Sequence, residues 1–244
     1  MSNYIGNILV ACEYSGRVRD AFENLGWNAL SIDLLPTESE QTKQAGKHWQ
    51  GDIFSFDDTP IYFEILKNRF DMLIGFPPCT YLTFAGKANW LDEGRTMKRI
   101  ESAKFFMKLY ELPIDHICIE NPQGIMTNIF RNPDQIIHPY YFGDHEMKRT
   151  CLWLKNLPPL YYAKERTLFD DEITAKEKPK PKYITLHKKT GKMKNRYFCD
   201  GYYNETENGK KLLFRSGHEK SKTFPGIANA MAEQWTKYFL TLKK

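Results

Sequence analysis

Short runs of apolar residues alternate along the chain with segments in which apolar residues recur every three or four positions. The apolar runs predict strands buried in a sheet, and they cover residues 7–12, 28–33, 48–53, 71–76, 115–120 and 150–154. The segments with helical spacing cover residues 15–26, 92–111 and 225–242. This alternation predicts an α/β fold, an open and mostly parallel sheet with helices on both faces.

Each predicted helix has one apolar side, which we expect to pack on the sheet. The first helix places Val18, Ala21, Phe22 and Leu25 on that side, the second Ile100, Ala103, Phe106, Met107 and Tyr110, and the C-terminal one Ile227, Met231, Trp235 and Phe239. These residues form the predicted helical half of the core.

Polar residues gather where the predicted strands end. They are Glu13, Ser15 and Gly16 after the first strand, Asp33 after the second, Asp52 near the third, Pro77, Pro78 and Cys79 after the fourth, and Glu120, Asn121 and Pro122 after the fifth. Ligands bind at the carboxyl ends of the strands in open α/β sheets, so this edge is the predicted functional site. Taken singly, Asp33 and Asp52 are equally well explained as solvated strand ends.

Two prolines precede Cys79, and they restrict the backbone and remove two N–H donors, so the cysteine is held rigidly at the strand end. A free thiol has a pKa of about 8.5, so a nucleophile here needs a neighbouring cation or a helix terminus. The alternative is a buried structural cysteine. Burial beside this loop can keep Glu120 partly protonated and able to donate a proton. The alternative for Glu120 is a cap for the next helix.

The 244-residue chain carries a net charge of +5, and its positive charge is local. Residues 164–222 hold 16 Lys and Arg against 9 Asp and Glu, and the segment 176–196 holds nine basic residues against one acid. Lysines that neutralise phosphates, together with nearby aromatic rings, are typical of nucleic-acid binding, although a solvated loop has a similar pattern. The residues expected to contact a polynucleotide are Lys188, Lys189, Lys192, Lys194 and Arg196.

The five cysteines form neither a Cys-x-x-Cys pair nor a Cys/His ladder, so we expect no disulfide framework and no structural zinc. No apolar run approaches the length of a membrane span. The first residues lack the pattern of a secretory signal. We therefore expect a soluble protein of the bacterial cytoplasm that binds no metal.

The segments 77–79 and 120–122 together resemble the cytosine-C5 DNA methyltransferase family, which has a Pro-Cys loop carrying the nucleophile and a Glu-Asn-Val loop. A short, often phage-encoded branch of that family is similar in its Pro-Pro-Cys-Thr-Tyr-Leu loop. The chain also carries that branch's Lys-x-Thr-Cys-Leu-Trp-Leu segment at 148–154 and its Pro-Gly-Ile-Ala segment at 225–228. The resemblance covers about residues 1–158 and 223–244.

The resemblance implies a Rossmann-like sheet and transfer of a methyl group from S-adenosyl-L-methionine (SAM) to C5 of cytosine in DNA. In that reaction Cys79 adds to C6 of the base while Glu120 protonates or hydrogen-bonds N3. Lys148 and Arg149 then contact the target base or stabilise the thiolate. The implied substrate-binding residues in the two loops are Pro78, Thr80 and Asn121.

The resemblance also implies a SAM site and a division into domains. Asp33 accepts hydrogen bonds from the ribose hydroxyls of the cofactor, and Asp52 binds its adenine amino group. The other implied cofactor-binding residues are Glu13, Ser15, Gly16, Pro77 and Gly226. The implied domains are a catalytic core over residues 1–158, a small basic target-recognition insertion over 159–222, and a C-terminal helix over 223–244 that returns to the core.

Three alternatives differ in substrate or in class. Methyltransferases that act on adenine N6 or cytosine N4 place a polar residue before Pro-Pro and an aromatic one after it, whereas this chain has Phe76 and Cys79 there. A cytosine-C5 enzyme acting on a free nucleotide or on RNA is a closer alternative, and the basic stretch favours a polymer. The third is a catalytically inactive DNA-binding relative, against which the presence of both Cys79 and Glu120 argues.

Overall fold

The computed structural model describes residues 4–55, 64–65, 67, 69–84, 92–162, 178–181, 183–186, 191–197, 202–206, 209–213, 219 and 221–243. The chain divides into two compact units. The first comprises Met1–Ile137, Arg149–Tyr161 and Ala228–Lys244, and the second His138–Lys148 and Tyr162–Ile227. The expected insertion at 159–222 stays a prediction.

The first unit is built on a seven-stranded sheet with the order β3-β2-β1-β4-β5-β7-β6. Its strands are β1 (Asn7–Ala11), β2 (Asn28–Asp33), β3 (His48–Gln50), β4 (Met72–Gly75), β5 (His116–Pro122), β6 (Gln135–Ile137) and β7 (Thr150–Lys155). The first five strands run parallel, and β7 is antiparallel to both β5 and β6. The strand order reverses between β1 and β4, which is where such sheets bind ligands.

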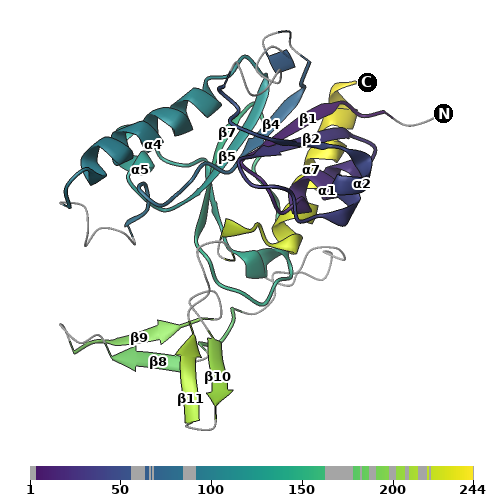
Figure 1. Cartoon of the computed structure of the whole chain (residues 1–244). Coiled ribbons are helices and arrows are strands. Elements are labelled where there is room, and N and C mark those ends of the chain that lie inside the picture. Colours follow the sequence, from purple (N-terminus) through teal and green to yellow (C-terminus); the bar gives the residue numbers. More distant parts are fainter. Residues whose placement is uncertain are drawn as a thin grey trace. The chain divides into compact units, whose positions relative to one another are not determined.

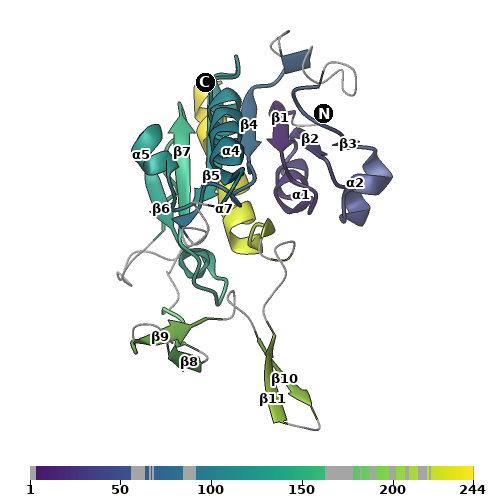
Figure 2. The ribbon, with the colours of Figure 1, turned by 60° about the vertical axis from the view of Figure 1, so that its left-hand side comes forward.

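Helices cover both faces of this sheet. They are α1 (Arg17–Glu23), α2 (Glu40–Ala45), α4 (Arg95–Tyr110), α5 (Met126–Ile129) and α7 (Pro225–Leu242). In Figure 1, α1 and α7 lie on one face and α4 and α5 on the other, and Figure 2 gives a second view, in which α4 passes in front of α7. The predicted Rossmann-like α/β fold is therefore confirmed.

Strand β1 shows why the strands appear in the sequence as apolar runs. Leu9 and Ala11 belong to the cluster under α4, whereas Ile8 and Val10, one position along, point to the opposite face, and all four are fully buried. A strand with helices on both sides has no polar face, so its sequence cannot alternate.

The residues of helix α7 that were predicted to face the sheet are buried. Met231 and Trp235 are fully buried, and the ring of Phe239 packs edge-on against that of Trp27, with 4.8 Å between centroids. The Trp27 indole Nε1–H donates to Thr236 Oγ1 (2.7 Å), so this large buried ring keeps its polar atom paired. The contact joins the chain end to the turn after α1.

Two predicted helical faces differ from the observed ones. In α4 the buried residues are Ala103, Phe106 and Leu109, whereas Ile100 is 42% exposed. In α1 the helix ends at Glu23, so Leu25 lies in the following turn and is partly exposed. The error in α1 comes from the end of the helix, where the helical period no longer governs which side chain faces the sheet, whereas Ile100 lies inside α4 and not at its end.

The second unit contains a short 3₁₀ helix, Pro139–Phe142, and two antiparallel hairpins. The hairpins are β8 (Tyr183–Leu186) with β9 (Met193–Arg196), and β10 (Tyr202–Thr206) with β11 (Gly209–Leu213). Lys194 and Arg196 lie in β9, Lys192 is exposed just before it, and Lys188 and Lys189 fall outside the described residues. Within the described ranges, no helix is long and apolar enough to cross a membrane.

Candidate active site

A cavity of about 320 Å³ lies at the carboxyl ends of β1, β2 and β3. It is lined by Cys12, Ile32, Asp33, Leu34, Gly51, Asp52, Ile53, Pro78, Glu101, Ser102 and Phe105. The walls are mainly apolar with a few polar groups, and both the size and this composition are typical of a small-molecule site. Three predicted site residues, Asp33, Asp52 and Pro78, thus come together although 45 positions separate the first from the last.

The two aspartates are fixed by their own loops. Asp33 Oδ1 accepts from the backbone N–H of Leu35 (2.8 Å), and Asp52 Oδ1 accepts from that of Phe54 (2.9 Å). Both are local turns in which the side chain holds the residue two positions ahead. These turns end β2 at Asp33 and carry the chain past β3, which ends at Gln50 rather than continuing to 53 as predicted. The carboxylates therefore have a defined orientation at the cavity.

Cys12 has a strained backbone at the end of β1. Its φ of 60° is in the left-handed region, which is uncommon for a residue other than glycine, and its N–H donates to Ile32 O (2.7 Å). Such conformations cluster at ligand sites. Burial raises the pKa of the Cys12 thiol, and the negative charges of Asp33 and Asp52 raise it further. Cys12 is consequently a neutral, unreactive thiol that shapes the cavity.

Glu13 caps helix α1 from inside the protein. Its side chain Oε1 accepts from the backbone N–H of Val18 (2.7 Å), and Oε2 accepts from that of Arg19 (3.3 Å). A carboxylate at a helix N-terminus pairs the otherwise unpartnered donors of the first turn. Glu13, Ser15 and Gly16 are not among the residues that line the cavity, so their predicted part in cofactor binding stays a prediction.

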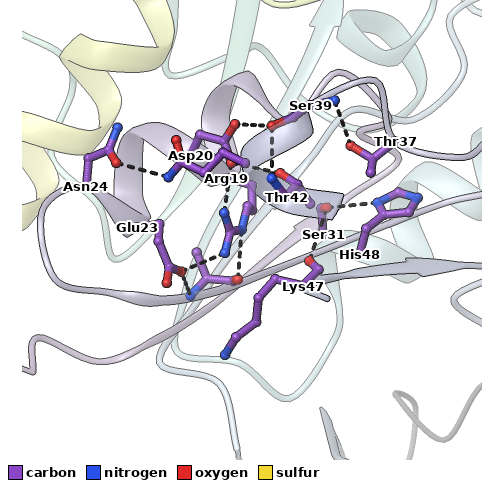
Figure 3. Close-up of polar contacts among 12 residues, drawn as sticks. Arg19, Asp20, Glu23, Asn24, Ser31, Thr37, Ser39, Thr42, Lys47 and His48 are labelled. Carbon is purple, nitrogen blue, oxygen red and sulfur yellow. Dashed lines mark hydrogen bonds and ion pairs between the residues drawn. The ribbon is translucent and has the colours of Figure 1, made fainter. Parts of the chain in front are cut away.

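The glycine at 16 allows two helices to approach each other. Gly16 has a φ of 72°, and a Cβ there would lie 2.3 Å from Ser39 Cβ, so only glycine fits. Helix α2 packs against this point because Asp20 of α1 accepts from Ser39 Oγ and from Thr42 Oγ1 (2.7 Å for Thr42). Figure 3 shows this network, in which α1 and α2 are joined through one carboxylate.

A buried arginine extends the same network toward the sheet. Arg19 is fully buried and donates from Nε to Ala29 O of β2 (3.1 Å), while its guanidinium pairs with Asp20 (2.8 Å) and Glu23 (3.0 Å) (Figure 3). A buried charge is tolerated only when it is paired in this way. On the other side of β2, His48 contacts Leu35 O (2.9 Å) and so holds the loop that carries the cavity residue Leu34.

The loop that carries the predicted nucleophile and the end of strand β5, which carries the predicted acid, are joined by a hydrogen bond. Asn121 is 1% exposed, and its Nδ2 donates to the Pro77 carbonyl (2.8 Å). Strand pairing places Gly75 beside Ile119, so Glu120 follows next to the start of the Pro-Pro-Cys loop. Cys79 itself is half-buried. The predicted meeting of the segments 77–79 and 120–122 is therefore present in the structure.

The segments that follow Cys79 and β5 are also paired with each other. Leu82 O accepts from the backbone N–H of Ile125 (2.8 Å), and Thr83 forms a bridge with Gly124. A Cβ on Gly124 would lie 2.0 Å from Leu82 O, so the backbones approach more closely than any other residue permits. This pairing fixes the backbone path of the residues that follow Cys79.

Helix α4 supplies cations to the loop that follows Cys79. The guanidinium of Arg95 lies 5.2 Å from the ring centre of Tyr81, and Lys98 Nζ lies 5.8 Å from it. Both are favourable cation–ring contacts. Thr80, a predicted substrate contact, is exposed between Cys79 and this ring.

The remaining predicted residues are distributed between the two units. Arg149 belongs to the first unit and directly precedes Thr150, which pairs with Pro122 at the end of β5. Lys148 belongs to the second unit. Gly226 also belongs to it, and its N–H donates to Asp144 Oδ2 (2.8 Å). The predicted role of Lys148 at the target base or the thiolate and that of Gly226 in cofactor binding stay predictions.

Sequence reasoning missed the residues that α4 contributes to the cavity, Glu101, Ser102 and Phe105. A helix in the middle of the chain carries no strand-end signal, so nothing in the pattern marked these positions. The one usable sign was that Glu101 and Phe105 lie four positions apart and therefore share a helical face.

The buried carboxyl of Glu13 predicts a pH-dependent stability. Burial raises its pKa from 4.5 to about 7, although the N–H donors of Val18 and Arg19 act in the opposite direction. Between these two values the folded protein keeps a proton that the unfolded chain has lost, so stability falls as the pH rises. The full difference is about 3 kcal/mol, at about 1.4 kcal/mol per pKa unit.

Urea unfolding at intervals from pH 5 to pH 8 measures this effect as the free energy of unfolding. We expect Glu13→Gln to flatten the decline, because the amide does not titrate. The exposed Glu93→Gln is the matched control and should keep the slope of the unchanged protein. An equal slope in all three proteins would show that Glu13 titrates normally in the folded state.

Comparison with known proteins gives structural likenesses only. No family model matches the chain, and no curated protein sequence does. A candidate DNA modification methyltransferase encoded within a prophage (E. coli) is 16% identical, with a TM-score of 0.40 over 61% of this chain and 46% of that one. The Entamoeba histolytica methyltransferase EhMeth is 15% identical, with a TM-score of 0.43 over 72% of this chain and 58% of that one. The chain thus spans about half the length of these two proteins.

Proposed function

We propose that the protein transfers a methyl group from SAM to C5 of cytosine in DNA through a covalent bond between Cys79 and C6 of the base. One observation carries this proposal. Pro78 lines the cavity at the strand ends, and the next residue is Cys79. The loop that holds both is joined by Asn121 to the end of β5, which carries Glu120. A thiol, an acid and a small-molecule cavity thus occupy neighbouring positions.

The cavity residues fit an adenosyl cofactor. Ile32, Ile53 and Phe105 offer apolar surfaces for the adenine ring, and Asp33 and Asp52 are acceptors for ribose hydroxyls and for the adenine amino group. When bound, SAM supplies a methyl group that is activated by a positive sulfonium. The protein orients that group. Pro78 lines the cavity, and the cysteine is the next residue in the chain.

The proposed chemistry uses Cys79 and Glu120 in turn. The thiolate of Cys79 forms an S–C6 bond while Glu120 delivers a proton or a hydrogen bond to N3, which turns C5 into a nucleophile. C5 then accepts the methyl group. A base removes the C5 proton, and the electrons of that C–H bond restore the C5–C6 double bond and expel the cysteine sulfur. In duplex DNA the base must first leave the stack, at a cost of a few kcal/mol.

Positive charge near the loops supports this mechanism. We propose that Arg149 contacts the target base or the thiolate. It directly precedes Thr150, which pairs with the end of β5. Arg95 and Lys98, packed on Tyr81, add cations on the loop that follows Cys79. A cation favours the thiolate form over the neutral thiol. We assign Thr80 and Asn121 to substrate binding as well, and we keep Lys148, which belongs to the second unit, as a proposed contact to the target base or the thiolate.

Base analysis after incubation with tritiated SAM tests the proposal directly. The protein is incubated in parallel with DNA, with RNA and with dCMP, and each substrate is hydrolysed and separated by chromatography. We expect tritium in 5-methylcytosine from DNA. Label in RNA or in dCMP alone would overturn the DNA assignment, label in N4-methylcytosine or N6-methyladenine would overturn the covalent mechanism, and no label in any arm would overturn the enzymatic function.

The basic segment gives a separate prediction about binding. Neutralising Lys188, Lys189, Lys192 and Lys194 to glutamine should weaken DNA binding and reduce the salt dependence of its affinity. The slope of log K against log salt should fall by about 0.9 for each DNA phosphate that the variant no longer neutralises. Fluorescence anisotropy with labelled DNA at salt concentrations from about 50 to about 300 mM measures this slope.

A control variant carries the same loss of charge elsewhere. It replaces four exposed lysines of the first unit, Lys43, Lys67, Lys104 and Lys237, with glutamine. This variant should keep most of the salt slope, and SAM affinity should be unchanged in both variants. A parallel loss of SAM affinity in the first variant would instead assign the segment to the cofactor site.

A further inference from the structure

We propose that Glu101 of α4 is a third acidic cofactor-binding residue, and that with Asp33 and Asp52 it makes the cavity select the positively charged cofactor over its neutral product. This inference rests on the proposed function, because it takes the cavity as the SAM site. It adds a residue outside the strand-end loops and assigns the cavity a preference between two forms of the same ligand.

The geometry places Glu101 on the cavity side of its helix. Glu101 and Phe105 lie one helical turn apart, and both line the cavity, while Ala103, Phe106 and Leu109 turn toward the buried cluster. The ring of Phe105 packs edge-on against Phe54, with 5.3 Å between centroids. Helix α4 is therefore held against the loop after β3, and it places Glu101, an exposed residue, at the wall of the cavity.

The charged groups of the cavity all have the same sign. Three carboxylates, those of Asp33, Asp52 and Glu101, are among its lining residues, and among the described residues that line it there is no lysine, arginine or histidine. The remaining walls are apolar apart from the small polar groups of Cys12 and Ser102. An anionic ligand is disfavoured in such a cavity, and a cationic one is favoured.

Methyl transfer removes one positive charge from the cofactor. SAM carries a sulfonium, an ammonium and a carboxylate, for a net charge of +1, whereas its product S-adenosylhomocysteine lacks the sulfonium and is neutral. Near a protein surface the effective dielectric constant is about 20 rather than about 80, so carboxylates a few ångströms away distinguish the two ligands. A cavity that attracts the sulfonium also releases the product more readily once the charge is lost.

Calorimetric titration of both ligands into the full chain tests the role of Glu101. We expect Glu101→Gln to raise the Kd for SAM about fivefold and the Kd for S-adenosylhomocysteine less than twofold. Glu101→Asp keeps the charge and should restore most of the difference. Glu111→Gln, an exposed glutamate at the end of the same helix, is the matched control and should change neither value. High salt should reduce the selectivity of the unchanged protein, because exposed charges are screened.

The possible outcomes distinguish a failure of the Glu101 proposal from a failure of the proposed function. Equal losses for both ligands in Glu101→Gln would overturn charge selection, because a merely structural residue affects both ligands alike. Unchanged affinities in that variant would overturn the assignment of Glu101 while leaving the SAM site in place. No binding of either ligand to the unchanged protein would overturn the proposed function itself.

Discussion

Replacing Cys79 with serine is expected to abolish methyl transfer and to leave SAM binding within about twofold of the unchanged protein. A serine hydroxyl is a far weaker nucleophile than a thiolate, and loss of a catalytic nucleophile lowers kcat by factors on the order of 10³ or more. Cofactor binding should survive because the cavity is lined by Pro78, while Cys79 lies one position beyond it. Tritium transfer to DNA measures the first effect, and calorimetry with SAM measures the second.

A trapping experiment tests the proposed covalent step directly. In DNA that carries 5-fluorocytosine, the fluorine at C5 cannot leave as a proton does, so the S–C6 bond cannot break after methylation. The unchanged protein should therefore form a complex with this DNA that withstands denaturing electrophoresis, and only when SAM is present. Mass analysis of the digested complex should place the modified base on Cys79.

Cys118→Ala is the matched control for this prediction. Cys118 is a fully buried thiol in β5, only two positions before Glu120, and burial raises its pKa well above the usual value. Its removal should leave the trapped complex intact, since a buried neutral thiol does not attack a base. A trapped complex in the serine variant at position 79, or its loss in Cys118→Ala, would contradict the assignment of the nucleophile.

The part of the site that sequence could predict is the part that a parallel sheet assembles. Asp33 ends β2, and Asp52 and Pro78 come after β3 and β4. The shared direction of these strands brings their ends to one edge. No knowledge of side-chain packing was needed for this step. Similarly, the buried residues of α7 are the predicted ones, because the helix begins and ends where the apolar period does, from Pro225 to Leu242.

The parts that sequence could not predict depend on contacts between elements. Arg19 has the character of a surface residue of α1, and it is buried because Ala29 O, Asp20 and Glu23 together pair its guanidinium. Glu101 lines the cavity only because α4 packs across the strand ends. No propensity of cysteine indicates the left-handed backbone of Cys12, whose N–H donates to Ile32 O of β2.

The close pairing of the segments that follow Cys79 and strand β5 gives the second large expected effect. Replacing Gly124 with alanine should lower the rate of methyl transfer about 100-fold while SAM affinity changes less than about twofold. The added Cβ would lie 2.0 Å from Leu82 O and 2.7 Å from Leu82 C, which are backbone atoms and cannot rotate away. The loop after Cys79 must then move, and a displacement of about 1 Å at a reacting group costs about 10²-fold in rate. Single-turnover transfer of tritium to DNA measures this loss.

Gly46→Ala separates this steric effect from an ordinary loss of glycine. Gly46 ends α2 with a φ of 61°, and nothing lies within 4 Å of a Cβ built there, so its substitution costs only backbone strain, about 1–2 kcal/mol. That variant should be less stable in urea and yet transfer the methyl group at the normal rate. If Gly124→Ala lost stability alone and kept its rate, the loop pairing at Leu82 would hold the fold together without positioning Cys79.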